Sequence, residues 1–85
     1  MQVLIPTSLR SYTRDSYVAA EGATLDAVLA ALDRQYPGIR FRMIDEQERM
    51  RAHMRFFVNG QQVRDLAHPL RPDDALAIVQ ALSGG

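Results

Sequence analysis

The chain has 85 residues, of which 47% are hydrophobic and 24% charged, which fits one small globular domain and excludes a disordered polar chain. Ten basic and ten acidic residues give a formal net charge of zero, so we expect no nucleic-acid partner. There is no cysteine, which excludes disulfides, thiolate metal sites and a cysteine nucleophile.

The first part of the chain predicts a hairpin that leads into a helix. Residues 3–5 are apolar and β-branched and end at Pro6, so they predict a strand. Residues 9–14 carry Ser, Tyr and Thr and predict a loop. Residues 16–20 predict a second strand that returns beside the first, and residues 21–23 predict a turn.

The helix is the clearest prediction. The hydroxyl of Thr24 can cap the first turn, and Asp26 favours the positive end of the helix dipole. Apolar side chains at the spacing i, i+3, i+4, i+7 form one stripe: Leu25, Val28, Leu29 and Leu32, extended by Tyr36. The Pro-Gly pair at residues 37–38 ends the helix.

The second half of the chain predicts further strands. Residues 39–43 alternate apolar residues with arginine, which is a weak strand pattern. Residues 55–58 and 61–64 predict two strands joined by Asn59-Gly60 in a type I′ turn. Residues 75–80 predict the last strand. The polar segments between them, residues 45–51 and 69–74, predict a loop and a turn.

This order predicts an α+β fold with one helix across one face of a mixed sheet, and with the first and last strands paired in parallel at its centre. The other face of the sheet stays uncovered. Because Phe56 and Phe57 are adjacent, they point to opposite faces, and one of them must lie on the uncovered side. An aromatic patch there, near Val79 and Pro6, is either a docking surface or a set of ordinary exposed apolar residues.

The apolar segments are too short to cross a membrane, so we expect no membrane partner. A helix that crosses a bilayer needs about 20 apolar residues, and no run approaches that length. Residues 1–6 have no basic flank and too short an apolar stretch for a secretory signal. We therefore expect a cytoplasmic protein.

Two glycines, Gly84 and Gly85, stand at the end of the sequence. They are either a loose end or a sign that the terminal carboxylate is itself the reactive group. Glycine has no Cβ, so such a tail can enter a narrow channel at any backbone angle. An end just beyond a buried last strand can reach a partner's active site without unfolding the domain.

An ordered set of motifs resembles the ubiquitin-like β-grasp sulfur carriers of the MoaD/ThiS type, over essentially the whole chain. The motifs are VLIPT at residues 3–7, GATL at 22–25, YPGI at 36–39, FVNG at 57–60, LRPDD at 70–74 and ALSGG at 81–85. Within the family, IPTSLR at residues 5–10 and Val63-Arg64 are most similar to the CysO-like branch. The resemblance implies a β-grasp domain over residues 1–82 and a flexible Gly-Gly tail over residues 83–85.

The resemblance also implies a chemistry. A ubiquitin-activating-type adenylyltransferase would use ATP to adenylate the Gly85 carboxylate, and a sulfur donor would replace AMP to leave a thiocarboxylate. Gly84 and Ser83 would enter the partner's active site, while Pro6, Phe57 and Val79 would dock the partners. The chain itself would bind no cofactor and perform no catalysis. It would serve cofactor or cysteine biosynthesis as a carrier.

The sequence leaves the acceptor enzyme open between a cysteine-synthase-like enzyme, a thiazole-forming enzyme and the large subunit of a molybdopterin synthase. In the last case the chain would be the small subunit of that synthase. A further alternative is a ubiquitin-like modifier that forms isopeptides with lysines. All ten basic residues of the chain are arginine, which either reflects a GC-rich genome or keeps side-chain amines away from a reactive acyl group.

Two positions depart from the family pattern. Asp73-Asp74 stands where the family usually has Gly-Asp, so we expect an aspartate in a left-handed conformation in that turn. Glu48 stands where the family often has glycine.

Other candidates for chemistry favour surface roles. His53 and His68 lack ligand spacing, so we expect no metal site. The carboxylates Asp45, Glu46 and Glu48 and the basic residues Arg49, Arg51 and Arg55 are typical of solvated loops, with an acid/base site or a docking patch as the respective alternatives.

Overall fold

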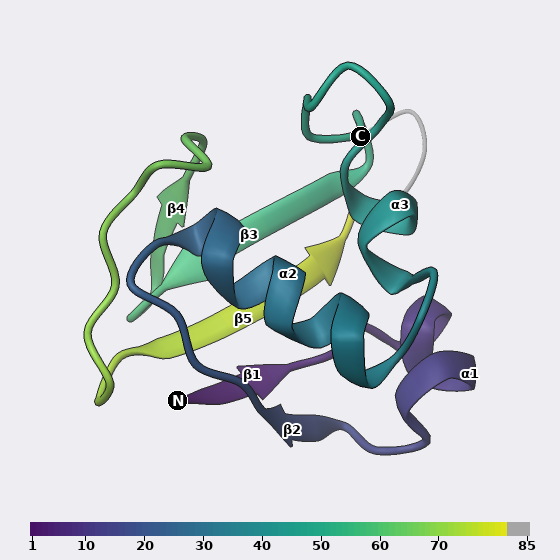
Figure 1. Cartoon of the computed structure of the whole chain (residues 1–85), viewed down its shortest axis with the longest axis horizontal. Helices are drawn as coiled ribbons and strands as arrows, with labels where there is room; N and C mark the ends of the chain where they lie inside the picture. Colours follow the sequence, from purple (N-terminus) through teal and green to yellow (C-terminus); the bar gives the residue numbers. More distant parts are fainter. Residues whose placement is uncertain (82–85) are drawn as a thin grey trace.

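Five strands form one mixed sheet in the order β2-β1-β5-β3-β4, and the longest helix crosses one of its faces (Figure 1). The structure is a computed structural model that describes residues 1–81. Its elements are β1 (Gln2–Leu4), the 3-10 helix η1 (Thr7–Leu9), α1 (Arg10–Thr13), β2 (Tyr17–Ala19), α2 (Leu25–Gln35), α3 (Ile39–Met43), β3 (Met54–Val58), β4 (Gln61–Val63) and β5 (Ala75–Gln80). This arrangement confirms the predicted α+β, β-grasp fold.

The two central strands, β1 and β5, run parallel, as predicted. Val3 lies opposite Leu76 in this pair, and both side chains are buried. On one side β2 pairs antiparallel with β1, and on the other β3 pairs antiparallel with β5. Because β5 is bonded on both sides, the chain reaches its last described residues from the centre of the sheet.

Helix α2 supplies the apolar layer over the sheet. The Thr24 hydroxyl accepts a hydrogen bond from the Ala27 N–H at 3.2 Å, so the predicted cap is confirmed. The four residues of the predicted stripe are all 0% exposed: Leu25, Val28, Leu29 and Leu32. Phe56 packs into the same core at 0% exposure, which leaves Phe57 on the uncovered face.

Residues 39–43 form a helix, so the predicted strand is wrong. Asp33 explains this, because its Oδ1 accepts hydrogen bonds from the N–H groups of Gly38 and Arg40, both at 3.1 Å. The carboxylate therefore satisfies free amides where α3 begins. Ile39 and Met43, four residues apart, are fully buried, whereas Phe41 between them is 56% exposed. The burial follows a helical spacing and not the alternation of a strand.

The predicted loop at residues 9–14 is also wrong, because η1 and α1 occupy it. Pro6 starts the turn, and its carbonyl accepts a hydrogen bond from the Leu9 N–H at 2.9 Å. Leu9 and Thr13, one helical turn apart, are buried. Arg14 ends the segment with a left-handed φ of 64°.

The predicted hairpin turn is confirmed, but the left-handed residue expected in the Asp73-Asp74 turn is found in a different loop. Asn59 and Gly60 have φ values of 50° and 85°, as a type I′ turn requires. Within residues 1–81 neither Asp73 nor Asp74 has a positive φ, so the expected left-handed aspartate is wrong. Glu48 has a φ of 60°, which explains why glycine suits that position.

Asp74 holds its turn by hydrogen bonds. Its carboxylate accepts from the Arg71 N–H at 2.8 Å and from the Asn59 side-chain amide at 2.9 Å. These hydrogen bonds favour the ionised carboxylate and lower its pKa below the ordinary value of 3.8. The turn before β5 is thereby joined to the β3–β4 hairpin.

We expect Asp74→Asn to reduce the acid sensitivity of folding. Because the folded-state pKa lies below the unfolded one, the stabilisation is complete above about pH 4 and is lost as pH falls through the folded pKa. Thermal melts from about pH 6 to pH 2 should show a stability deficit of the variant that shrinks in acid. Asp73→Asn is the control, since Asp73 accepts neither hydrogen bond. Parallel curves for wild type and Asp74→Asn would contradict the assignment.

Candidate functional site: the end of the last strand

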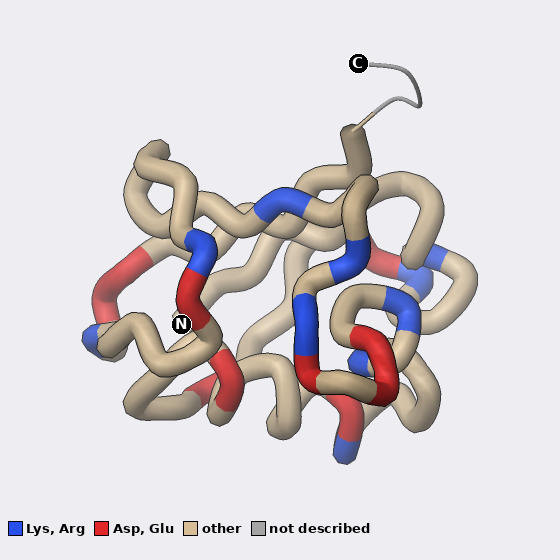
Figure 2. Tube along the Cα trace, turned by 90° about the horizontal axis from the view of Figure 1, so that it is seen from above, with Lys and Arg blue, Asp and Glu red and all other residues tan. Residues whose placement is uncertain are grey.

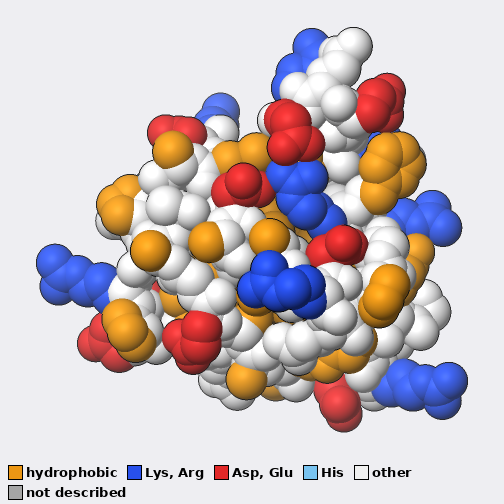
Figure 3. Space-filling model, in the orientation of Figure 1, with side chains coloured by type: hydrophobic (Ala, Val, Ile, Leu, Met, Phe, Trp, Pro, Cys, Tyr) orange, Lys and Arg blue, Asp and Glu red, His pale blue; other side chains and the backbone are white. Residues whose placement is uncertain are grey.

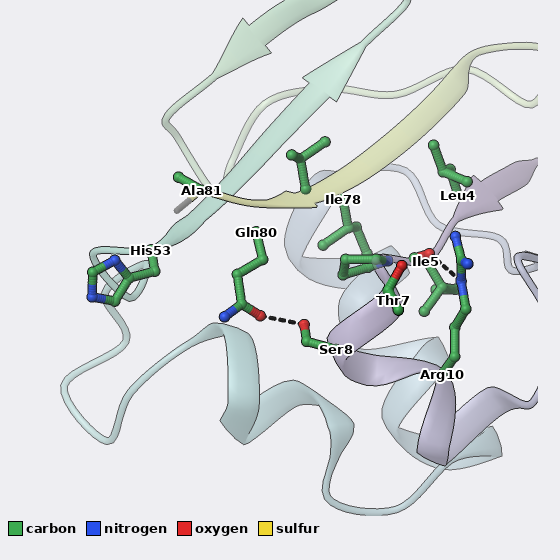
Figure 4. A pocket seen from close by; sticks show the side chains of 11 residues that line it. Leu4, Ile5, Thr7, Ser8, Arg10, His53, Ile78, Gln80 and Ala81 are labelled. Carbon is green, nitrogen blue, oxygen red and sulfur yellow. Dashed lines mark hydrogen bonds between the residues drawn. The ribbon is translucent and has the colours of Figure 1, made fainter. Parts of the chain in front are cut away.

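A groove of about 750 Å³ lies beside the point where β5 ends; we call it the sheet-side groove. Pro6 follows β1, η1 contributes Ser8, and β5 contributes Val79 and Gln80. Figure 4 labels Ser8 and Gln80 among the side chains that line it. Ala81, the last described residue, also lines it. The last described residue therefore lies in the wall of a groove.

Local hydrogen bonds fix the walls of this groove. The Ser8 hydroxyl donates to Oε1 of Gln80, which ties η1 to the end of β5 (Figure 4). Arg10 Nε donates to the Ile5 carbonyl at 3.0 Å and closes the bend after β1. The Ala81 N–H donates to the His53 carbonyl at 2.7 Å, so the backbone remains anchored for one residue beyond β5.

Two of the three predicted docking residues line the sheet-side groove. Pro6 and Val79 both line it, and Val79 is 38% exposed. Phe57 does not line it. It lies on the same uncovered face, opposite Ala77 of β5. The structure thus separates Phe57 from the pair at the groove.

Phe57 instead belongs to a row of residues that crosses the uncovered face. Register places Phe57 opposite Ala77, Ala77 opposite Leu4, and Leu4 opposite Tyr17. Tyr17 is 54% exposed, and the other three are half-buried. This row continues to the groove through Val79, two residues beyond Ala77 on the same face, and Arg55 and Gln62 flank it. A continuous apolar surface is typical of a protein interaction site.

The predicted reactive tail, Ser83, Gly84 and Gly85, lies outside the described residues. The proposed boundary between residues 1–82 and 83–85 is likewise a prediction that the described part of the chain does not test. What the structure places is the base of that tail, at Gln80 and Ala81.

The other charged candidates have structural partners. Arg40 joins two segments, because its guanidinium contacts Asp26 at 2.7 Å and Glu48 at 3.0 Å. The carboxylate of Asp45 accepts from the N–H groups of Arg49 and Gln47, and these hydrogen bonds lower its pKa. These contacts stabilise the loop and indicate no acid/base pair.

Arg55 and the histidines also lie at the surface. Arg55 Nη1 donates to the carbonyls of Ala52 and Met54, at 2.6 and 3.1 Å. His53 is exposed and lines the sheet-side groove, whereas His68 lies in the loop before β5. Among residues 1–81 no three His, Asp or Glu side chains gather to hold a metal ion.

Charge is mixed over the molecule. Basic and acidic positions are interspersed along the trace (Figure 2), and the face that carries α2 shows charged side chains of both signs among scattered apolar ones (Figure 3). In the described part of the chain no helix has the length and apolarity to cross a membrane. The sheet-side groove, in contrast, has apolar side chains such as Leu4, Ile78 and Val79 in its lining.

Several residues that line the sheet-side groove are not predicted from the sequence. Ser8 of η1, Arg10 of α1 and Gln80 of β5 are not predicted as site residues, although all three line the groove. The signal was Pro6 followed by Thr7 and Ser8, since proline stops a strand and small hydroxyl residues favour the start of a helical turn.

The ThiS family matches residues 3–85. The chain belongs to this family. It is 36% identical to the sulfur carrier protein CysO of Mycobacterium tuberculosis (strain H37Rv), over 98% of this chain and 96% of that protein. CysO of Mycobacterium bovis matches with the same values.

Solved structures agree with this membership. The crystal structure of M. tuberculosis CysO has a TM-score of 0.89 and 33% identity, covering 95% of this chain and 98% of that one. A BexX/CysO complex from Amycolatopsis orientalis contains a chain with a TM-score of 0.91 and 32% identity, covering 99% and 98%. The small archaeal modifier protein SAMP1 of Haloferax volcanii, with a TM-score of 0.79 and 24% identity, covering 100% and 98%, shares the fold alone.

Proposed function

We infer that this member of the ThiS family is a sulfur carrier of the CysO type that acts with partner enzymes and is not itself an enzyme. The inference is supported by the 36% sequence identity with CysO, which extends over 98% of this chain, and by the similarity to the crystal structure of CysO. The structural observation that carries it is the position of β5. This strand is held between β1 and β3 and delivers the chain to an open groove at the edge of an apolar face.

The reactive group in this proposal is the carboxylate of Gly85. A carboxylate is a poor acyl donor because of its charge, so it first needs a leaving group. One carboxylate oxygen attacks the α-phosphorus of ATP and pyrophosphate leaves, which gives an acyl-adenylate. A sulfide equivalent from the sulfur donor then attacks the acyl carbon, and AMP leaves. The net change is one oxygen replaced by sulfur at Gly85.

In this proposal the described domain positions the Gly85 carboxylate and takes no part in the reaction itself. Ala81 is held by the His53 carbonyl, so the reach from the groove is set by the four residues that follow. Four extended residues span at most about 14 Å. A partner active site must therefore lie within that distance of the groove. The partners proposed are a ubiquitin-activating-type adenylyltransferase that uses ATP, and an acceptor enzyme of cysteine or cofactor biosynthesis.

Intact-mass spectrometry tests this proposal. The purified chain is incubated with ATP, the activating enzyme of the same organism and a sulfur donor. We expect a mass increase equal to the difference between sulfur and oxygen, located at Gly85 by fragmentation. A chain that stays at its original mass under conditions that charge a known carrier would overturn the proposal. Conjugates with target lysines would instead favour a protein modifier, and stable copurification with a large subunit would favour the molybdopterin synthase alternative.

We expect Gly84→Ala to lower kcat/KM for charging by about tenfold, or about 1.4 kcal/mol, because an added Cβ must fit a channel shaped for a bare backbone. One residue added after Gly85 should be equally harmful. Gly60→Ala is the control, since it adds the same Cβ to a glycine outside the tail, where nothing lies within 4 Å. The measurement is the initial rate of thiocarboxylate formation. Charging of Gly84→Ala at the wild-type rate would refute the narrow-channel argument.

A further inference from the structure

A second groove opens on the other side of the end of β5, next to α1 and α3. Its volume is about 500 Å³. We call it the helix-side groove and define it by Ser8, Tyr12, Arg42, Arg51, His53 and Gln80. Unlike the sheet-side groove, it is lined by two guanidinium groups and several hydroxyls. Its chemistry therefore differs from that of the apolar face.

The two arginines of this groove donate their side-chain hydrogen bonds to neutral groups. Arg42 Nε donates to the Tyr12 hydroxyl at 2.9 Å, a hydrogen bond that also raises the pKa of Arg42. Arg51 Nε donates to the Phe41 carbonyl at 2.7 Å, and its guanidinium carbon lies 4.5 Å from the centre of the Phe41 ring. Within residues 1–81 neither forms a salt bridge. Both positive charges therefore remain available to an outside partner.

The acidic residues near α3 form their salt bridges and hydrogen bonds with groups other than Arg42 and Arg51. Arg40, on the same helix as Arg42, pairs with both Asp26 and Glu48. Asp45 is close enough to Arg51 for the two charges to interact. Its carboxylate nevertheless accepts from N–H groups of its own loop and pairs with Arg49. The acidic residues near α3 are thus committed elsewhere, and the helix-side groove keeps its positive charge.

The two grooves meet at the end of β5. Ser8, His53 and Gln80 line both of them, and the Ser8–Gln80 hydrogen bond forms part of the wall between them. The chain therefore emerges between an apolar groove and a basic one. A partner that takes the residues beyond Ala81 into an active site within about 14 Å must surround this point. It will contact both grooves at once.

We propose that the helix-side groove docks an acidic segment, rich in Asp or Glu, on the rim of the partner enzyme's active-site entrance. This rests on the proposed function, because the partner is the enzyme that receives the tail. Guanidinium groups bind carboxylates through paired, charge-assisted hydrogen bonds. Phe41, 56% exposed beneath Arg51, adds the aromatic surface that is enriched with arginine in interfaces.

Two surfaces of different chemistry also fix orientation. An apolar face alone allows a partner to dock in several rotated poses, since apolar contact has no direction. An acidic segment that pairs with Arg42 and Arg51 permits only one of these docking poses, and it also speeds association. The helix-side groove therefore determines which way round the partner approaches the end of β5.

The first test compares Arg42→Gln/Arg51→Gln with Arg34→Gln/Arg71→Gln, which removes the same charge from exposed sites outside both grooves. Association with the activating enzyme is followed by stopped-flow fluorescence over a range of NaCl concentrations. We expect the groove variant to associate about tenfold more slowly at low salt, with a flatter salt dependence than the control. Equal rates and equal salt slopes for the two variants would overturn the proposal. Thermal melts of both variants establish that they are folded.

The second test needs no partner enzyme. The chain is labelled with ¹⁵N and titrated with a hexaglutamate peptide and, separately, with inorganic phosphate. We expect the peptide to shift the side-chain Nε resonances of Arg42 and Arg51 and to leave that of Arg34 unchanged. A response to phosphate without one to the peptide would overturn the proposal in favour of a small-anion site. Because neither titration involves Gly85, their failure is distinct from a failure to form the thiocarboxylate.

Discussion

Replacing Gly22 with alanine should destabilise the domain by about 3 kcal/mol, because a Cβ at this position has no room. It would lie 2.6 Å from the Val28 nitrogen and 2.8 Å from both the carbonyl carbon and the Cβ of Ala27. Two of these atoms belong to the backbone of the first turns of α2 and can move only if the helix moves. Gly22 therefore sets how closely the β2–α2 connection approaches the start of the helix.

For 85 residues, total stability is roughly 4–13 kcal/mol, so this loss is a large fraction of it. The midpoint of thermal unfolding should fall by roughly 12–24 °C. Circular dichroism melts and urea titration measure both quantities. Gly60→Ala is the control, because its Cβ meets nothing within 4 Å and only the positive φ of 85° is unfavourable. That variant should lose only about 1 kcal/mol. Equal losses in the two variants would show that close approach is not the reason for Gly22.

The parts of the fold that the sequence predicts correctly are those with several agreeing local features. Helix α2 combines a threonine cap, a full apolar stripe and a Pro-Gly end. The β3–β4 hairpin combines two β-prone runs with Asn59-Gly60. The parallel pairing of β1 and β5 follows because both strands are strongly apolar. The helix and the hairpin depend on residues close together in the sequence, whereas the pairing of β1 with β5 joins strands at opposite ends of the described chain.

The parts it predicts wrongly depend on contacts across the sequence. Five residues fit both a strand and one helical turn, so residues 39–43 cannot be assigned from their pattern alone. The deciding group is Asp33, which lies in the preceding helix. The left-handed residue was expected at the Asp73-Asp74 turn, but hydrogen bonds from Asn59 and Arg71 hold that turn without it.

The candidate site likewise has a part that the sequence predicts and a part that it does not. Pro6 and Val79 could be predicted at the end of the last strand because family resemblance and strand order both point there. The helix-side groove could not, since η1, α3, the segment before β3 and the end of β5 each contribute to it. The sequence places Arg51 in a solvated loop, with a docking patch as the alternative. Its position against Phe41 and beside the end of β5 depends on the helical form of residues 39–43.

Val79→Glu should lower kcat/KM for charging about 100-fold, the equivalent of about 2.7 kcal/mol, and leave the fold intact. Val79 is 38% exposed and lines the sheet-side groove, so a partner that docks there must bury the new carboxylate. Burying a charged group in an apolar interface is costly, and the desolvation penalty can exceed what an ion pair returns. The domain itself tolerates the change because Arg55 lies directly opposite on β3 and can pair with it.

Ala75→Glu is the matched control for this prediction. Ala75 is exposed and lies on the same face of the same strand, four residues and about 13 Å further from the end of β5. It adds the same charge without touching the groove, so its charging rate should stay within about twofold of wild type. The defect of Val79→Glu should appear mainly in KM, because the tail and its carboxylate are unchanged. If both variants lose activity equally, net charge and not the groove governs docking. If neither does, the partner approaches the end of β5 without using the apolar face.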